Sequence, residues 1–137
     1  MGTEIHWLAV LLAGVAGFAV GGVWYSLLFG KAWMAARGVT KEQIQAGGAK
    51  PGMLFGITFL LDLVMAFVLD HVFGTYTPTP GLHFSLFVAG GIALGFVIPA
   101  MAVNYLYQQA SLKLFLIDAG HWFFAFLAMG AVLSLAG

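Results

Sequence analysis

The stretch from Met53 to Phe73, MLFGITFLLDLVMAFVLDHVF, decides the fold. Its only ionisable side chains are Asp62 near the middle and Asp70 and His71 near the end. At 1.5 Å per residue, such a helix is long enough to cross a hydrocarbon core of roughly 30 Å. An ionised carboxylate costs about 2.5 to 3.5 kcal/mol at the centre of a membrane helix, so we expect Asp62 to face protein, water or a partner charge. The stretch therefore predicts a transmembrane helix that packs against other helices.

The composition of the whole chain is typical of a membrane protein. Of its 137 residues, 62% are hydrophobic and 7% are charged, which would leave a water-soluble domain without a polar surface. Five basic and five acidic residues cancel, so there is no basic surface for nucleic acid. The absence of cysteine excludes disulfides, thiolate nucleophiles and cysteine-ligated metal centres. We predict one transmembrane domain over residues 1–137.

The apolar runs predict an all-α, polytopic fold with four transmembrane helices arranged as two hairpins. With four spans, every lysine and arginine falls on the same side of the membrane, and the positive-inside rule makes that side cytoplasmic. Four spans then place both termini outside the cytoplasm. The predicted spans are residues 7–29, 53–73, 83–107 and 112–135, and the basic residues are Lys31, Arg37, Lys41, Lys50 and Lys113.

The cytoplasmic connection, residues 30–52, contains a signal for a short amphipathic surface helix. Thr40, followed three residues later by Gln43, has the form of a capping box, which favours a helix over residues 41–46. Gly38 is a suitable residue to end the preceding helical segment.

A second carboxylate follows nearly the same local sequence as the first, because FLLD at residues 59–62 is echoed by FLID at residues 115–118. The two hairpins would then form a weak parallel repeat, with an axis along the membrane normal. Chance is the alternative, since Leu- and Phe-rich helices resemble one another.

Three polar residues are candidates for an intramembrane cluster with Asp62. Asp118 and His121 lie three residues apart and so share a helix face, and Asn104 is a further polar side chain of the third span. Ionisable groups inside membrane spans mark proton or ion pathways. The alternative is a hydrogen-bonded clasp that holds the second and fourth spans together.

A different polar group gathers at the predicted outer surface. Imidazoles with carboxylates can bind zinc or copper, although histidines are also common at membrane interfaces and these residues have no tight ligand spacing. The candidate metal ligands are Glu4, His6, Asp70, His71 and His83.

Glycines at four-residue intervals predict close helix packing. Gly17 and Gly21 form one pair in the first span, and Gly91 and Gly95 form another in the third span. Pro99 cannot donate its backbone hydrogen bond, which predicts a kink in the third span.

The stretch WYSLLFGKAW resembles the signature WYSPLLFGKAW of a family of small bacterial membrane proteins, domain of unknown function 1761, although the proline after the serine is missing here. The segment SLKLFLIDAG, residues 111–120, is similar to that family's last span. The resemblance implies a four-helix protein of the prokaryotic inner membrane and supplies no activity. The motif residues are Trp24, Tyr25, Ser26, Phe29, Gly30, Lys31 and Trp33.

Three functions are compatible with this sequence. The first is an oligomeric transport-type protein with a proton or cation path through the intramembrane Asp and His residues. The second is a non-catalytic scaffold or accessory subunit of a membrane complex, and the third is a lipid- or metal-binding membrane protein. We expect no cofactor, a lipid bilayer as the surroundings, and a homo-oligomer or a larger complex. Enzymatic motifs are absent, although Asp118 and His121 could in principle act as an acid–base pair.

Overall fold

The structure is a computed structural model that describes residues 5–48, 50–78 and 80–137. This part of the chain is helical and contains no strand. Four stretches are long and apolar enough to cross a membrane, so the fold is all-α with four candidate spans, as predicted. They are Trp7–Leu28, Pro51–Gly74, Leu82–Tyr107 and Leu112–Ala136.

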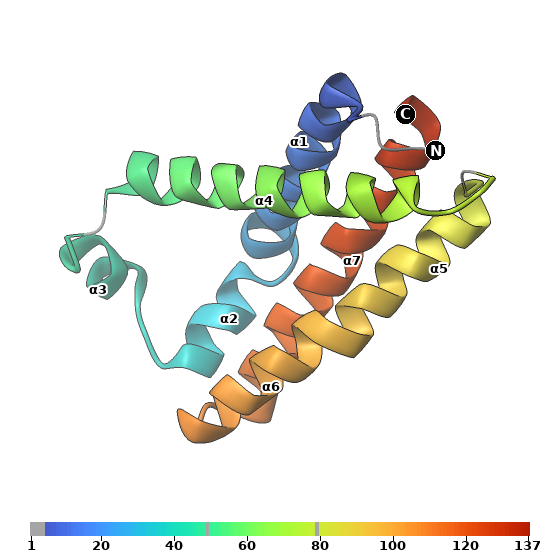
Figure 1. The fold of residues 1–137 in the computed structure, drawn as a ribbon. Coiled ribbons are helices and arrows are strands. Elements are labelled where there is room, and N and C mark those ends of the chain that lie inside the picture. The colour runs from blue at the N-terminus through green and yellow to red at the C-terminus, as the bar shows by residue number, and fades with distance from the viewer. Residues whose placement is uncertain (1–4, 49, 79) are drawn as a thin grey trace.

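Two of the spans contain a π-helical turn, and two short helices lie between the first and second spans (Figure 1). The elements in chain order are α1 (Trp7–Val23), the π turn η1 (Trp24–Leu28), α2 (Gly30–Arg37), α3 (Lys41–Ala46), α4 (Pro51–Gly74), α5 (Leu82–Ile92), the π turn η2 (Ala93–Val97), α6 (Ile98–Tyr107) and α7 (Leu112–Ala136).

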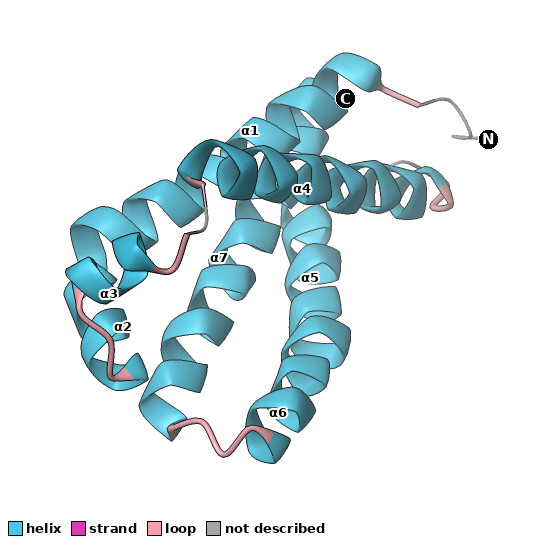
Figure 2. Cartoon of the chain, turned by 90° about the vertical axis from the view of Figure 1, so that its left-hand side faces the viewer, coloured by secondary structure: helices cyan, strands magenta, loops and turns pink. Residues whose placement is uncertain are grey.

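The spans pack as two hairpins joined through α1 and α7. In the first hairpin α1 packs against α4, and in the second α5 and α6 pack against α7. The contact between α1 and α7 is the most extensive in the molecule and joins the two hairpins. Figures 1 and 2 show α4 crossing the other spans steeply, with its N-terminal half extending toward α3. Accordingly, every residue of segment 51–58 is exposed.

Small residues form much of the buried interior, because lipid supplies little hydrophobic driving force and close helix packing must take its place. Gly130 of α7 lies so close to α5 that an added Cβ would come within 2.7 Å of the Ala89 side chain. Larger side chains, among them Leu69, Phe126 and Met129, complete the core.

The connection between the first two spans is shaped by local signals that the sequence contains. Gly38 ends α2 in the left-handed conformation, with φ of 75°. Thr40 then caps α3: its hydroxyl accepts a hydrogen bond from the Gln43 backbone N–H at 3.1 Å, and its own N–H donates to the Gln43 side chain at 2.8 Å.

The two π turns differ in their local cause. η2 directly precedes α6, whose second residue is Pro99, and proline removes a backbone donor from the helical ladder. η1 contains no proline and ends at Phe29, where φ is −126° and the helical path breaks. The third span is thus irregular next to Pro99, where the sequence predicts a kink, whereas the irregularity at η1 has no such residue to announce it.

Candidate functional site

Three spans meet at the carboxylate of Asp118, which is buried in the first third of α7. The Tyr25 hydroxyl of η1 donates a hydrogen bond to Oδ1 at 2.5 Å. The Tyr105 hydroxyl of α6 donates to Oδ2. Both carboxylate oxygens therefore have phenolic donors, one from each hairpin. We call Asp118, Tyr25, Tyr105 and His121 the Asp118 cluster.

The η1 turn is fixed against α7 by the residue before Tyr25. The Trp24 indole N–H donates to the Ile117 carbonyl at 2.9 Å. The indole lies over Gly120, where an added Cβ would come within 2.9 Å of the ring. The absence of a side chain at Gly120 thus allows Trp24 to lie close to α7, and the neighbouring Tyr25 is held where its hydroxyl reaches Asp118.

His121 is the fourth member of the cluster, and its ring has an unmet hydrogen-bonding requirement. The side chain is buried, and Nδ1 has no hydrogen-bond partner among the described residues. The ring lies 5.1 Å from that of Tyr25, centroid to centroid, and 4.6 Å from that of Trp122. Nε2 faces α1, where an added Cβ on Gly21 would lie 3.1 Å away. Since a buried polar atom without a partner costs free energy, His121 is a candidate for a functional role.

Asp62 lies in a different setting. It is 2% exposed, in the middle of α4, and forms no hydrogen bond with any residue in the described ranges. It lies 11 residues after the start of α4, whereas Asp118 lies six residues after the start of α7. These offsets correspond to about 17 Å and about 9 Å along the two helices. The structure thus places Asp118 and His121 together, without a hydrogen bond from Asp62.

Asn104 is exposed on α6 and does not point into the cluster, although the sequence made it a candidate. Its neighbour Tyr105 takes the position in the cluster instead. Neither Tyr25 nor Tyr105 was identified as a partner of Asp118 from the sequence, where Tyr25 was named only as a residue of the WYSLLFGKAW motif. The sequence did contain one indication of these contacts, because a tyrosine hydroxyl within an apolar helix needs a hydrogen-bond partner.

The motif WYSLLFGKAW forms the joint between the first span and α2. The Phe29 ring packs on Trp24 at 4.6 Å between centroids, and a Cβ on Gly30 would clash with the Tyr25 carbonyl. The Ser26 hydroxyl is exposed and donates to the Gly22 carbonyl within its own helix.

The last part of the motif lies at the end of the membrane span. Trp33 approaches Tyr25 edge to face at 6.2 Å, and the Arg37 guanidinium lies 5.2 Å from the Trp33 ring centroid. Lys31 is exposed. The motif thus connects the Asp118 cluster to the part of the molecule where Lys31 and Arg37 lie.

Only two of the candidate metal ligands meet in the described structure. The His6 backbone N–H donates to Asp70 Oδ2 at 3.2 Å, and the imidazole Nδ1 lies 3.1 Å from Oδ1. His71 and His83 are exposed, and residues 5–48, 50–78 and 80–137 contain no group of three His, Asp or Glu side chains suited to a metal ion. Glu4 lies outside the described residues.

The two glycine pairs have different surroundings. An added Cβ on Gly17 would lie 3.2 Å from Met129 of α7, and one on Gly21 would approach His121. In contrast, Gly91 and Gly95 are exposed and an added Cβ would meet nothing within 4 Å. Gly90 instead faces α7, so any close packing by the second pair would be with a molecule outside this chain.

One comparison with known proteins found a match. A family model described as "Protein of unknown function (DUF1761)" matches residues 8–134, almost the whole chain. The searches of curated proteins and of solved structures returned no match.

Proposed function

The chain belongs to the family of proteins of unknown function DUF1761, and from that starting point we propose that it is a small transport-type membrane protein in which Asp118 binds a proton or a cation. The supporting observation is the convergence of Tyr25, Tyr105 and Asp118, from three spans, beside a histidine with an unpartnered ring nitrogen. Ionisable groups within membrane spans commonly serve proton or ion pathways.

The chemistry of the two phenols couples the charge of Asp118 to the contact between the hairpins. An ionised carboxylate only accepts hydrogen bonds, so it can satisfy both tyrosine hydroxyls at once. Protonation turns one carboxyl oxygen into a donor, so the phenol at that oxygen either accepts this hydrogen bond, which frees its own O–H for another acceptor, or turns away. Release of Tyr25 would loosen the contact between η1 and α7, whereas release of Tyr105 would affect the second hairpin alone.

His121 is the polar residue next to Tyr25 on the proposed path of the proton or cation. Its Nδ1 has no hydrogen-bond partner among the described residues and can accept a hydrogen bond in the tautomer that carries the proton on Nε2, and its ring lies beside Tyr25. A tyrosine hydroxyl that leaves Asp118 therefore has an acceptor nearby. Asp62 is a second buried carboxylate, on α4, and we propose that it contributes to the path separately from the Asp118 cluster.

The basic residues support an orientation for this path. In Figure 1, α2 lies toward the same end of the molecule as residues 108–111, away from the start of α1 and the end of α7, and α3 lies to the side, near the N-terminal end of α4. We propose that this basic end faces the cytoplasm of a prokaryotic cell, with both termini on the outer side of the inner membrane. Four spans make a thin bundle, and we propose that copies associate, with the outward-facing Gly91 and Gly95 as a contact surface.

The proposal is tested by ion flux in liposomes containing the purified protein and a pH-sensitive dye. We expect the wild type to conduct protons or cations, Asp118→Asn to lower the flux at least tenfold, and Tyr25→Phe to raise it, because one restraint on the carboxylate is lost. Glu42→Gln in α3 is the matched control, since it makes the same acid-to-amide change at an exposed position. No flux in the wild type, or equal flux in Asp118→Asn, would refute the proposal.

A scaffold role is the second candidate, and a specific observation favours it. Both oxygens of Asp118 have hydrogen-bond donors, as expected for a clasp between helices. A clasp predicts that Asp118→Asn and Tyr25→Phe both lower the melting temperature in detergent, while liposomes with wild-type protein show no flux. Flux that Tyr25→Phe increases would exclude a purely structural role.

A further inference from the structure

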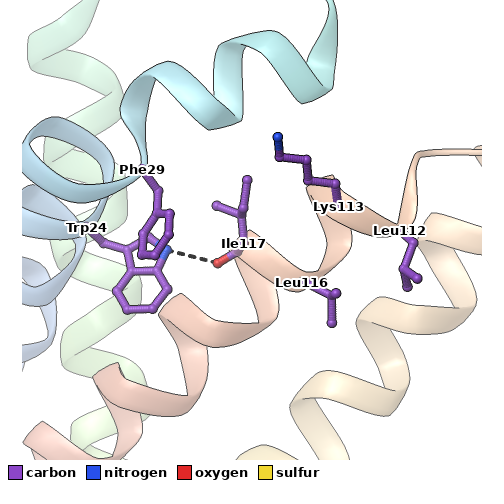
Figure 3. A pocket seen from close by; sticks show the side chains of 6 residues that line it. All are labelled: Trp24, Phe29, Leu112, Lys113, Leu116 and Ile117. Carbon is purple, nitrogen blue, oxygen red and sulfur yellow. Dashed lines mark hydrogen bonds between the residues drawn. The ribbon is translucent and has the colours of Figure 1, made fainter.

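An apolar groove lies between η1 and the first turns of α7, next to the connection that precedes α7 (Figure 3). Its volume is about 360 Å³, within the range of roughly 300–1,000 Å³ that is usual for ligand pockets. The groove is lined by Trp24, Phe29, Leu112, Lys113, Leu116 and Ile117.

The aromatic wall of this groove is held in place. The hydrogen bond from the Trp24 indole to the Ile117 carbonyl, drawn as a dashed line in Figure 3, fixes one ring against α7. Phe29 packs on that ring from the other side. Contacts within the chain therefore hold this wall in place.

Lys113 is the charged side chain of the lining, and its charge is uncompensated. The side chain is exposed, and within the described ranges no carboxylate oxygen lies within 4.0 Å of its ammonium group. The local charge therefore favours an anion.

The depth of the groove indicates what kind of anion fits. Lys113 is the second residue of the α7 span, where lipid headgroups are expected, and Ile117 lies about 6 Å further along the helix. We therefore expect the groove to extend from the headgroup level toward the hydrocarbon region. An occupant needs an apolar chain and a negative group at its outer end.

We propose that this groove binds an anionic phospholipid from the leaflet at the basic end, with an acyl chain against Trp24, Phe29 and Leu116 and the phosphate at Lys113. Basic side chains in clefts between transmembrane helices at the cytoplasmic side bind anionic headgroups. The site is separate from the Asp118 cluster, but Trp24 and Tyr25 are consecutive residues. A lipid in this groove would therefore stabilise the turn that carries Tyr25.

Native mass spectrometry of the full-length protein tests this site. The protein is reconstituted in nanodiscs of phosphatidylglycerol and phosphatidylcholine with identical acyl chains in equal amounts, and the retained lipid is measured after release. We expect the wild type to retain phosphatidylglycerol in preference to phosphatidylcholine. Lys113→Gln should lower that preference about fivefold. Leu116→Trp, at an exposed position, should fill the groove and lower retention of both lipids.

Lys31→Gln is the matched control, because it removes a cation from the same end without altering the groove. We expect it to keep the wild-type preference. The proposal is overturned if the wild type retains both lipids equally, if Lys113→Gln keeps the wild-type preference, if Lys31→Gln loses as much as Lys113→Gln, or if Leu116→Trp retains as much lipid as the wild type. Circular dichroism of each variant, with an unchanged helical signal, shows that a loss of lipid does not result from unfolding.

Discussion

Asp118 and Asp62 follow almost the same local sequence, but among the described residues only Asp118 has hydrogen-bond partners. Asp118 accepts hydrogen bonds from two tyrosines and has His121 on its own helix face. Asp62 is more deeply buried and forms no hydrogen bond with a described residue. Local sequence therefore does not determine the surroundings of either carboxylate; the elements that pack against each helix determine them.

The lengths of the connections explain much of this difference. A short turn, residues 108–111, separates Tyr105 from Asp118, so the two side chains meet across a tight hairpin. In the first hairpin, residues 26–50 separate Tyr25 from α4, and Tyr25 reaches Asp118 in place of Asp62. The predicted weak parallel repeat therefore does not extend to the hydrogen bonds of the two aspartates.

The largest expected effect is the difference in stability between a variant without the Asp118 carboxylate and a variant without the Asp62 carboxylate. Asp118→Ala leaves two phenols without their acceptor, and we expect it to lower the free energy of unfolding by about 3 kcal/mol. Asp62→Leu removes a carboxylate that has no hydrogen-bond partner among the described residues, and should be neutral or stabilising. Thermal unfolding in detergent, followed by circular dichroism, measures both. Equal losses in the two variants would mean that Asp62 has a partner in solution, and the comparison would fail.

A smaller effect is expected at the two tyrosines. Tyr25 joins the two hairpins, whereas Tyr105 forms a contact within the second hairpin. Tyr25→Phe and Tyr105→Phe each remove one hydroxyl, and we expect each to cost about 1 to 1.5 kcal/mol, since polar contacts in membrane proteins average about 0.6 and reach about 1.7 kcal/mol. Hydrogen exchange of the backbone amides distinguishes the effects of the two substitutions. Tyr25→Phe should speed exchange in residues 24–28, and Tyr105→Phe in residues 98–107. The same exchange pattern for both variants would contradict separate roles.

Much of the fold follows from the sequence, because span length and apolarity are local properties. The apolar runs predicted four membrane-spanning helices, and Thr40 and Gln43 predicted the cap that α3 has. The three-residue spacing of Asp118 and His121 likewise gave a shared helix face.

The cross-helix contacts could not be predicted in this way. Spacing along one helix does not specify which residue of another helix lies opposite, so the tyrosine partners of Asp118 were missed and Asn104 was included. Glycine spacing has the same limitation: it identified Gly17 and Gly21, which face α7, and equally Gly91 and Gly95, which face outward. The η1 turn had no proline to indicate it, and it is this turn that carries Trp24 and Tyr25 to α7.

The smallest expected effect concerns the glycine nearest to each aspartate. Gly120 lies two residues after Asp118, and a Cβ there would come within 2.9 Å of the Trp24 ring, so Gly120→Ala must displace the indole or the helix. We expect a loss of about 1 kcal/mol, at the lower end of the usual cost of overpacking. Gly56 lies six residues before Asp62, on the exposed half of α4, where an added Cβ meets nothing within 4 Å. Gly56→Ala should be neutral or stabilise the helix by up to about 1 kcal/mol. Melting temperatures measured side by side decide this, and a loss at Gly56 as large as that at Gly120 would show that the start of α4 packs closely after all.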